Sequence, residues 1–405
     1  MKRILLLIFF INTVITGFAQ QGNTYAFIKY DTSRLVFPGD SAAMLNFYNK
    51  LDALRDGEID KVVVAHFGGS HIQAGVWSET LADSFQAVGG FVGGGAYLFP
   101  YRLVKTNGPP FYKSHGTGTW TRCRAVPSEM CEGLGMSGMS ATTFDSTATF
   151  GFTLRPNNHI KSFHYIKLYF NFNPDYVLSI PESFPTGFQR RDFPEEGYAQ
   201  FHFDAPIDSI TFQVDRIGNA GTPFVFRGWI VENENPGVAY ISIGVNGAST
   251  NSYLQCTEFT NEMASVKPDL VIFSIGVNDA QDADIVYADF FARYDSLCAI
   301  VRSVSPDCAI LFTTISDNYI RKKTKNTRST KINAQIMEVA AKNGAAVWDM
   351  YTVMGGLGSI DKWYRSGLAS SDRIHFNNTG YKLIGGMMFE AIHEHYNAHS
   401  THHSN

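Results

Sequence analysis

The sequence predicts an α/β protein whose mostly parallel sheet is covered by helices and interrupted by an all-β insertion, a sandwich or jelly roll. Apolar runs of strand length alternate with segments of helical periodicity on both sides of this insertion. Between residues 150 and 232 the chain instead shows short aromatic or alternating runs, separated by Pro, Asn, Asp and Gly. We therefore expect one α/β domain, residues 20–90 and 236–397, divided by a β-rich module at 91–235. The aromatic side chains of this module either fill its core or, where they are exposed, can stack on sugar rings, which makes it a candidate glycan-binding module.

The first 19 residues have the pattern of a secretory signal peptide. Lys2 and Arg3 precede the apolar run Ile4–Phe10, and Gly17-Phe18-Ala19 supplies the small residues of a cleavage site. The apolar run is shorter than the ~20 residues that a membrane-spanning helix needs. We expect cleavage after Ala19, no stable membrane anchor, and a secreted or periplasmic protein.

The α/β elements follow from periodicity and from turn residues. Apolar positions at helical spacing predict a helix over 42–56, and the apolar run after Lys61 predicts a buried strand that leads into a helix over 71–87. After the insertion, the predicted elements are strand 240–243, helix 250–264, strand 270–275, helix 284–304, strand 309–314, helix 329–342, strand 346–348 and helix 379–396. Residues 398–405 are predicted to form a flexible tail.

Composition excludes several classes of function. With 44% hydrophobic and 17% charged residues the chain is globular, and a net charge of −4 gives no general attraction to nucleic acid. The five cysteines lack the close paired spacing of a zinc site, so we expect neither a metal nor another cofactor. Cys123 with Cys131 and Cys298 with Cys308 are candidate disulfides, and buried free thiols fit equally well. The oligomeric state is left open.

Ser70 is the candidate nucleophile. It stands in Gly68-Gly69-Ser70-His71, directly after the apolar run Val62–Ala65, and a strand that enters a glycine-rich turn and then a helix projects such a hydroxyl from the edge of a sheet. A serine hydroxyl needs a base and a group that orients the base. Taken alone, Ser70 fits the commoner role of a helix N-cap.

Two downstream motifs supply the remaining chemistry. Gly276-Val277-Asn278-Asp279 follows a predicted strand, and Asp372-Arg373-Ile374-His375 lies before the last predicted helix. Open parallel sheets bind ligands at the carboxyl ends of their strands, where these segments and Ser70 are expected to meet. Singly, Asn278 fits a turn and His375 fits a surface histidine. Their order and placement together favour a divided hydrolase site.

These motifs resemble those of the SGNH hydrolases, the GDSL-type esterases. The resemblance implies a flavodoxin-like, three-layer fold with a Ser70, His375 and Asp372 triad. It also implies an oxyanion hole formed by the amides of Ser70 and Gly247 and the side chain of Asn278, with Gly244 as the reserve for Gly247. Together with the inserted β module, the arrangement is similar to bacterial peptidoglycan O-acetylesterases and related carbohydrate esterases.

One residue departs from the family pattern: Gly69 stands where the family has Asp before the nucleophile. The resemblance implies that this carboxylate stabilises the nucleophile turn, so glycine puts the rigidity of the turn in question. Three functions follow as hypotheses. The first is an exported esterase that removes O-acyl groups, acetyl above all, from a carbohydrate such as peptidoglycan or a plant polysaccharide; the others are a lipid or thioester acylhydrolase and an inactive glycan-binding protein.

Overall fold

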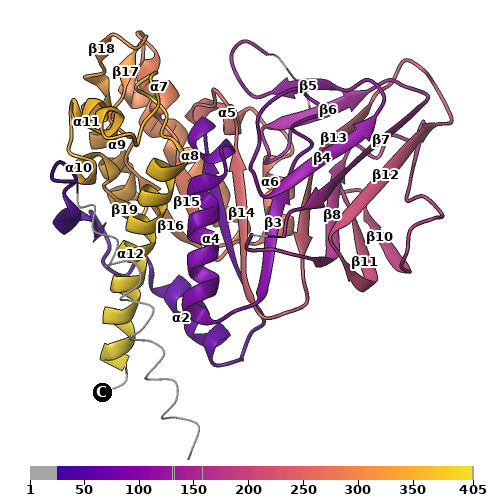
Figure 1. Ribbon diagram of the computed structural model, residues 1–405, viewed down its shortest axis with the longest axis horizontal. Helices are drawn as coiled ribbons and strands as arrows, with labels where there is room; N and C mark the ends of the chain where they lie inside the picture. The colour runs from indigo at the N-terminus through magenta and orange to yellow at the C-terminus, as the bar shows by residue number, and fades with distance from the viewer. Residues whose placement is uncertain (1–24, 130, 132, 157, 404–405) are drawn as a thin grey trace, which may run out of the picture.

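The computed structural model describes residues 25–129, 131, 133–156 and 158–403, so the predicted signal peptide lies outside the described residues. Figure 1 shows a region in which helices cover a sheet and, beside it, a region built of strands. A single sheet runs through both regions. The β-rich insertion is therefore joined to the α/β domain by backbone hydrogen bonds as well as by the chain.

The α/β region contains the parallel part of this sheet. Its strands lie in the order β19 (Ala346–Trp348), β16 (Ala309–Thr313), β15 (Leu270–Ser274), β2 (Lys61–Gly68), β14 (Gly237–Gly244) and β3 (Gly93–Leu98). The short β1 (Leu35–Val36) pairs antiparallel with β19 at the edge. Strands buried on both faces read as continuous apolar runs, which is why β2, β14, β15, β16 and β19 could be predicted from the sequence. By contrast, β3 was not predicted, because it begins with Gly93-Gly94-Gly95, which favours a loop.

Helices cover both faces of the parallel strands (Figure 1). One layer holds α2 (Leu45–Arg55), α4 (Val76–Gly89) and α12 (Asn378–His403), and the other holds α6 (Phe259–Val266), α8 (Tyr287–Val304) and α9 (Arg328–Lys342). Alternate residues of β15 enter the two cores: Ile272 packs with the first layer and Phe273 with the second. The predicted three-layer fold is confirmed.

Several helices differ from their predicted bounds. The helix predicted over 71–87 is divided into α3 (Ser70–Gln73) and α4, because Gly75 between them adopts a φ of +80° that ends the first turn. The last helix, α12, continues to His403 and so enters the predicted tail. The helix predicted over 250–264 is α5 (Thr250–Leu254) followed by α6, and short elements appear at η1 (Tyr30–Thr32), α7 (Val277–Gln281), β17 (Tyr319–Ile320), β18 (Thr324–Lys325), α10 (Met350–Val353) and α11 (Ser359–Arg365).

The inserted module extends the sheet and adds a second one. Beyond β3 the sheet continues with antiparallel strands: β13 (Phe224–Glu232), β8 (Phe163–Phe170), β11 (Tyr198–Ile207) and β10 (Phe188–Phe193), with the hairpin β5 (Thr121–Arg124) and β6 (Met139–Thr143) beside β13. The second sheet is β4 (Tyr112–Thr117), β7 (Thr147–Leu154), β12 (Ser209–Arg216) and β9 (Tyr176–Ser179). Buried rings of Phe150, Phe212 and Trp229 fill the core of this region, as in a sandwich.

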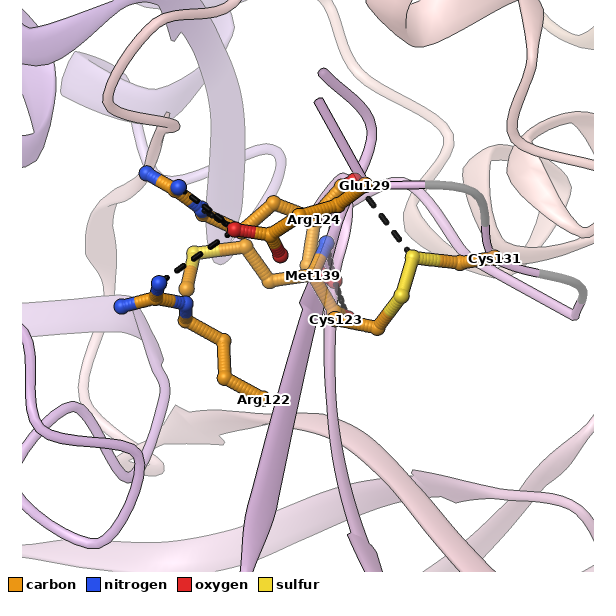
Figure 2. Close-up of a disulfide and its surroundings, with 7 residues drawn as sticks. Arg122, Cys123, Arg124, Glu129, Cys131 and Met139 are labelled. Atoms are coloured by element: carbon orange, nitrogen blue, oxygen red, sulfur yellow. Dashed lines mark hydrogen bonds and ion pairs between the residues drawn. A yellow bond between two sulfur atoms is a disulfide. The ribbon is translucent and has the colours of Figure 1, made fainter. Parts of the chain in front are cut away.

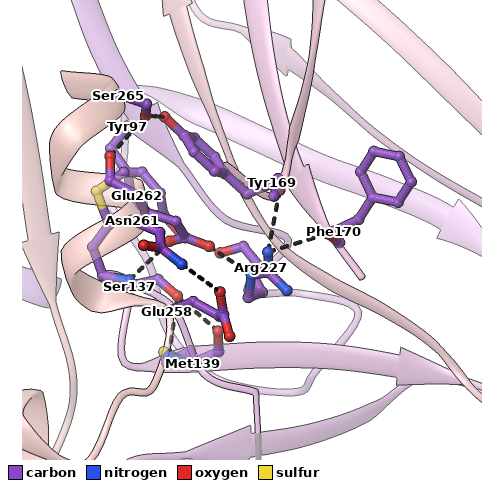
Figure 3. Close-up of polar contacts among 12 residues, drawn as sticks. Tyr97, Ser137, Met139, Tyr169, Phe170, Arg227, Glu258, Asn261, Glu262 and Ser265 are labelled. Atoms are coloured by element: carbon purple, nitrogen blue, oxygen red, sulfur yellow. Dashed lines mark hydrogen bonds and ion pairs between the residues drawn. The ribbon is translucent and has the colours of Figure 1, made fainter. Parts of the chain in front are cut away.

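A buried ion pair joins the module to the second helix layer (Figure 3). Arg227 on β13 donates from Nε to Glu262 on α6 at 2.5 Å, and its Nη2 donates to the carbonyl groups of Phe170 and Gly197. The second oxygen of Glu262 accepts the N–H of Met136 at 2.8 Å. Breaking such a pair leaves a buried charge, so the two regions are fixed relative to each other.

One of the two candidate disulfides is formed. Cys123 and Cys131 are bonded, whereas Cys298 and Cys308 are separate buried thiols, as is Cys256. Of the two alternatives for Cys298 and Cys308, buried free thiols are confirmed and the disulfide is not formed: Cys298 is buried on α8, and Cys308 hydrogen-bonds the carbonyl of Ala309 at the start of β16. Within the described residues, no helix has both the length and the apolarity to cross a membrane.

Candidate functional site

Ser70 begins α3, one residue after the glycine that follows β2. Gly68 and Gly69 form this turn, and a Cβ on Gly68 would lie 2.2 Å from Ile72, so only glycine fits there. As the first residue of the helix, Ser70 has an N–H for which the helix itself supplies no acceptor. The strand, turn and helix thus present a serine hydroxyl and an amide at the carboxyl end of β2.

His375 and Asp372 reach this hydroxyl from the loop before α12. The Oγ of Ser70 lies 2.7 Å from Nε2 of His375, and Nδ1 of His375 lies 2.8 Å from Oδ2 of Asp372. With Nδ1–H donated to the carboxylate, Nε2 is left to accept the serine proton. The structure therefore brings the three predicted residues together, although 305 positions separate Ser70 from His375.

Asp372 is held as a carboxylate. Burial works to raise its pKa, but hydrogen bonds from the His375 ring and from the N–H groups of His375 and Ile374 outweigh burial and hold the pKa well below its usual value. Oδ1 of Asp372 accepts both backbone N–H groups, from Ile374 at 2.9 Å and from His375 at 3.0 Å, so the loop folds around its own carboxylate. This charge stabilises His375 when the ring gains a proton.

A second histidine packs behind the first. The ring of His71 lies with its centroid 5.2 Å from that of His375, and its Nδ1 is 2.9 Å from the hydroxyl of Tyr381. Burial lowers the pKa of His71 to about 3, so this ring is neutral at ordinary pH. His71 supports the face of His375 without adding a charge beside it.

Asn278 and Gly247 lie beside the nucleophile turn. The Nδ2 of Asn278, on α7, would stand 3.3 Å from a Cβ on Gly69, and it donates one hydrogen bond to the carbonyl of Ala248 at 2.8 Å. Gly247 precedes Ala248 in the loop after β14 and has a φ of +87°. Asp279 braces α7 by accepting the hydroxyl of Thr250 at 2.7 Å. The predicted oxyanion donors therefore come from neighbouring segments.

Other groups hold the nucleophile turn that Gly69 was expected to loosen. The carbonyl of Gly68 accepts the hydroxyl of Tyr253 at 2.7 Å and the N–H of Val245 at 3.1 Å. The carbonyl of Gly69 accepts the N–H of Gln73 at 3.0 Å. These bonds fix both peptide groups before Ser70, so the turn has its own supports without a carboxylate at position 69.

Sequence reasoning missed a polar cluster around Asn246. Its N–H is donated to Oε1 of Gln73 at 2.6 Å, and its side chain donates to Oδ1 of Asn107 at 2.7 Å. Its carbonyl accepts Nη1 of Arg124 at 3.2 Å. These partners come from α3, from the start of the module and from β5, and no spacing along the chain predicts that they lie together.

Among the described residues, no group of His, Cys, Asp or Glu is arranged to hold a metal ion.

Comparison with known proteins agrees with this architecture. Residues 208–383 match the GDSL-like Lipase/Acylhydrolase family, a range that contains Asn278, Asp372 and His375 and leaves Ser70 outside. A solved structure described as a peptidoglycan O-acetylesterase in action superposes with a TM-score of 0.75 at 20% identity, over 90% of this chain and 99% of that chain. At this identity the likeness establishes a shared fold, which includes the inserted module.

Two further solved structures match only part of the chain. A lipase/acylhydrolase from Enterococcus faecalis has a TM-score of 0.32 at 23% identity, over 38% of this chain and 76% of that chain. An acetyl xylan esterase has a TM-score of 0.33 at 17% identity, over 38% of this chain and 81% of that chain. No curated protein matches the chain.

Proposed function

Because the chain is a GDSL-type serine hydrolase that acts on ester bonds, we propose that it removes O-acetyl groups from a carbohydrate. The observation that carries this proposal is the continuous line of hydrogen bonds from Ser70 through His375 to Asp372. Peptidoglycan or an acetylated plant polysaccharide is the proposed substrate. The structure that shares the whole fold, module included, is described as a peptidoglycan O-acetylesterase, which favours peptidoglycan of the two.

The reaction proceeds in two halves. The Oγ of Ser70 attacks the acetyl carbon while its proton passes to Nε2 of His375, and collapse of the tetrahedral intermediate gives that proton to the departing sugar oxygen. Water then attacks the acetyl-enzyme and gives its proton to His375, and Ser70 leaves with a proton returned from the ring. The products are acetate and a free sugar hydroxyl.

Three hydrogen-bond donors stabilise the negative oxygen of each tetrahedral intermediate: the amides of Ser70 and Gly247 and the side chain of Asn278. Only one hydrogen of Asn278 Nδ2 is bound to Ala248, and the amide group has a second to offer. Donors fixed in advance cost no reorganisation when charge develops, and this term is commonly the largest in acyl transfer. The supports of the Gly68 and Gly69 carbonyls serve this preorganisation.

Export is part of the proposal. The charged and apolar pattern of residues 1–19 predicts a cleaved signal, and the Cys123 to Cys131 disulfide is a bond that persists in oxidising compartments. Peptidoglycan and plant polysaccharides both lie outside the cytoplasm. The proposed location, secreted or periplasmic, thus agrees with the proposed substrate.

The decisive experiment measures acetate released from O-acetylated peptidoglycan and from acetylated xylan, with Ser70→Ala as the control variant. We expect release from peptidoglycan, little from xylan, and none above background with Ser70→Ala. Faster hydrolysis of long-chain p-nitrophenyl esters than of the acetate would instead favour a lipid acylhydrolase. Glycan binding without hydrolysis, and without labelling of Ser70 by a fluorophosphonate, would favour an inactive binding protein.

A further inference from the structure

Figure 2 shows a disulfide-closed loop of the inserted module, with Arg122, Arg124 and Glu129 beside the bond between Cys123 and Cys131. The bond between Cys123 and Cys131 closes this loop at the end of β5, and Arg122 and Arg124 flank Cys123 on that strand. Both guanidinium groups donate to one oxygen of Glu129: Arg124 at 2.5 Å and Arg122 at 3.3 Å. Arg124 also donates from Nε to this oxygen at 2.9 Å, so its fork is fixed in direction.

The remaining guanidinium nitrogen of Arg124 forms a hydrogen bond with the hydrolase domain. Its Nη1 donates to the carbonyl of Asn246 at 3.2 Å, and Asn246 directly precedes Gly247. The side chain of Val126, from the same loop, would lie 3.5 Å from a Cβ on Gly247. The module therefore contacts the oxyanion loop at the peptide group that joins Asn246 to Gly247.

That peptide group carries the proposed catalytic donor. The carbonyl of Asn246 and the N–H of Gly247 belong to one planar trans peptide, so the direction of the carbonyl sets the opposite direction of the N–H. The N–H of Ala248 donates to the carbonyl of Val245 at 3.0 Å, so this peptide is the central one of a tight turn in which Gly247 has a φ of +87°. The central peptide of such a turn can flip while the turn's own hydrogen bond is kept, because glycine tolerates both signs of φ. A bond from outside the loop to the Asn246 carbonyl opposes that flip.

We propose that Arg124 is a positioning residue that fixes the Gly247 N–H toward the oxyanion by holding the Asn246 carbonyl. Glu129 and the disulfide-closed loop hold Arg124 in turn, which makes the inserted module part of the catalytic apparatus. A charged donor on the carbonyl also polarises the peptide group and strengthens its N–H as a donor. This inference rests on the proposed function.

The test compares kcat and KM on p-nitrophenyl acetate for Arg124→Met with the matched control Arg122→Met. Arg122 shares the oxygen of Glu129 but donates there rather than to Asn246. An interaction made only in the transition state lowers kcat and leaves KM near its original value. We expect kcat to fall ~10-fold in Arg124→Met, because a misdirected oxyanion donor costs part of the ~10²-fold loss of a donor removed outright. Arg122→Met should retain wild-type kcat.

A second variant keeps the test decisive if Arg124→Met folds poorly. Arg124→Lys keeps the charge, but a single nitrogen cannot reproduce the fork that bonds Glu129 and Asn246 together. We expect its kcat to lie between those of the wild type and Arg124→Met, with a melting temperature close to that of the wild type.

Four contrary outcomes are distinguishable. Wild-type kcat in both Arg124 variants, or an equal fall in Arg124→Met and Arg122→Met, would overturn the positioning role while the wild-type esterase activity leaves the proposed function intact. A rise in KM at constant kcat would also overturn it, because that pattern belongs to ground-state binding. A wild-type protein that neither hydrolyses acetyl esters nor is labelled at Ser70 would instead remove the proposed function itself.

Discussion

Replacing Asn278 by alanine separates the proposed catalytic role of its side chain from its structural role. The Nδ2 group offers two hydrogens, one donated to the carbonyl of Ala248 at 2.8 Å and one available to the oxyanion. Asn278→Ala removes both. The first loss acts on folding and the second on the transition state, so two measurements on one variant test them independently.

The two losses differ in size. Leaving the partly buried Ala248 carbonyl without its partner should cost about 1 kcal/mol of unfolding free energy. Removing one oxyanion donor should cost about 3 kcal/mol of transition-state stabilisation. At 1.36 kcal/mol for each factor of ten, this second loss corresponds to a fall in kcat of ~150-fold. KM should change by less than about twofold, because the oxyanion forms only after the substrate binds.

The assay is steady-state hydrolysis of p-nitrophenyl acetate, paired with urea unfolding. Asn46→Ala is a matched control for stability, because Asn46 on α2 also donates from Nδ2 to a backbone carbonyl, that of Asp307 at 3.1 Å. We expect this control to retain wild-type kcat. An Asn278→Ala protein that is destabilised yet keeps kcat within about threefold of the wild type would refute the oxyanion role. Only the structural role, the hydrogen bond to the Ala248 carbonyl, would then remain.

Three further predictions concern the turn, the carboxylate and the pH dependence of stability. Gly69→Ala places a Cβ 3.3 Å from Asn278 Nδ2, so a small displacement of that amide should lower kcat by ~10-fold, measured on p-nitrophenyl acetate. Asp372→Asn should lower kcat by ~10⁴-fold near neutral pH, because the amide favours the wrong tautomer of His375. Burial lowers the pKa of His66 to about 3, below its unfolded value of ~6.5. Between these values the unfolded state binds one more proton at His66, so this residue alone should make the unfolding free energy in urea rise with pH by up to ~1.4 kcal/mol per pH unit, and His71, with the same lowered pKa, adds a like share.

Each of these predictions has a contradicting result. Wild-type kcat in Gly69→Ala would mean that the side-chain amide of Asn278 can accommodate the added Cβ and still donate to the oxyanion. Retention of more than about a tenth of wild-type kcat in Asp372→Asn would remove the carboxylate from the mechanism. His66→Asn should reduce the slope of unfolding free energy against pH by the share of His66 and leave that of His71, and an unchanged slope would show that His66 does not contribute to it.

Part of the site could be predicted because its reactive side chains lie in short sequence motifs. Ser70 follows an apolar run and a glycine turn, and Asp372 and His375 stand three positions apart, close enough for one loop to bring them together. Most of the parallel strands were predicted for a related reason, since a strand such as β15 is buried on both faces and is apolar from Leu270 to Phe273.

Other features depend on contacts that no local pattern encodes. The Cys298 and Cys308 thiols have a spacing that allows a bond, yet each is buried separately in the packed fold. The contact of Arg124 with Asn246 joins residues 122 positions apart, and their polarity alone would suit any surface loop. The module was predicted as an insertion, but its continuity with the main sheet follows from the pairing of β3 with both β14 and β13.

The sequence by itself determined the α/β class, the presence of a β-rich module and the residues of the candidate triad, because burial period and reactive side chains are local properties of the chain. Only the tertiary structure decided how the turn at Gly69 is supported and which groups aim the Gly247 amide. Those supports, Tyr253 at the Gly68 carbonyl and Arg124 at the Asn246 carbonyl, are hydrogen bonds between a side chain and a distant peptide group. Every residue offers such a peptide group, so its partner is chosen by packing rather than by sequence spacing.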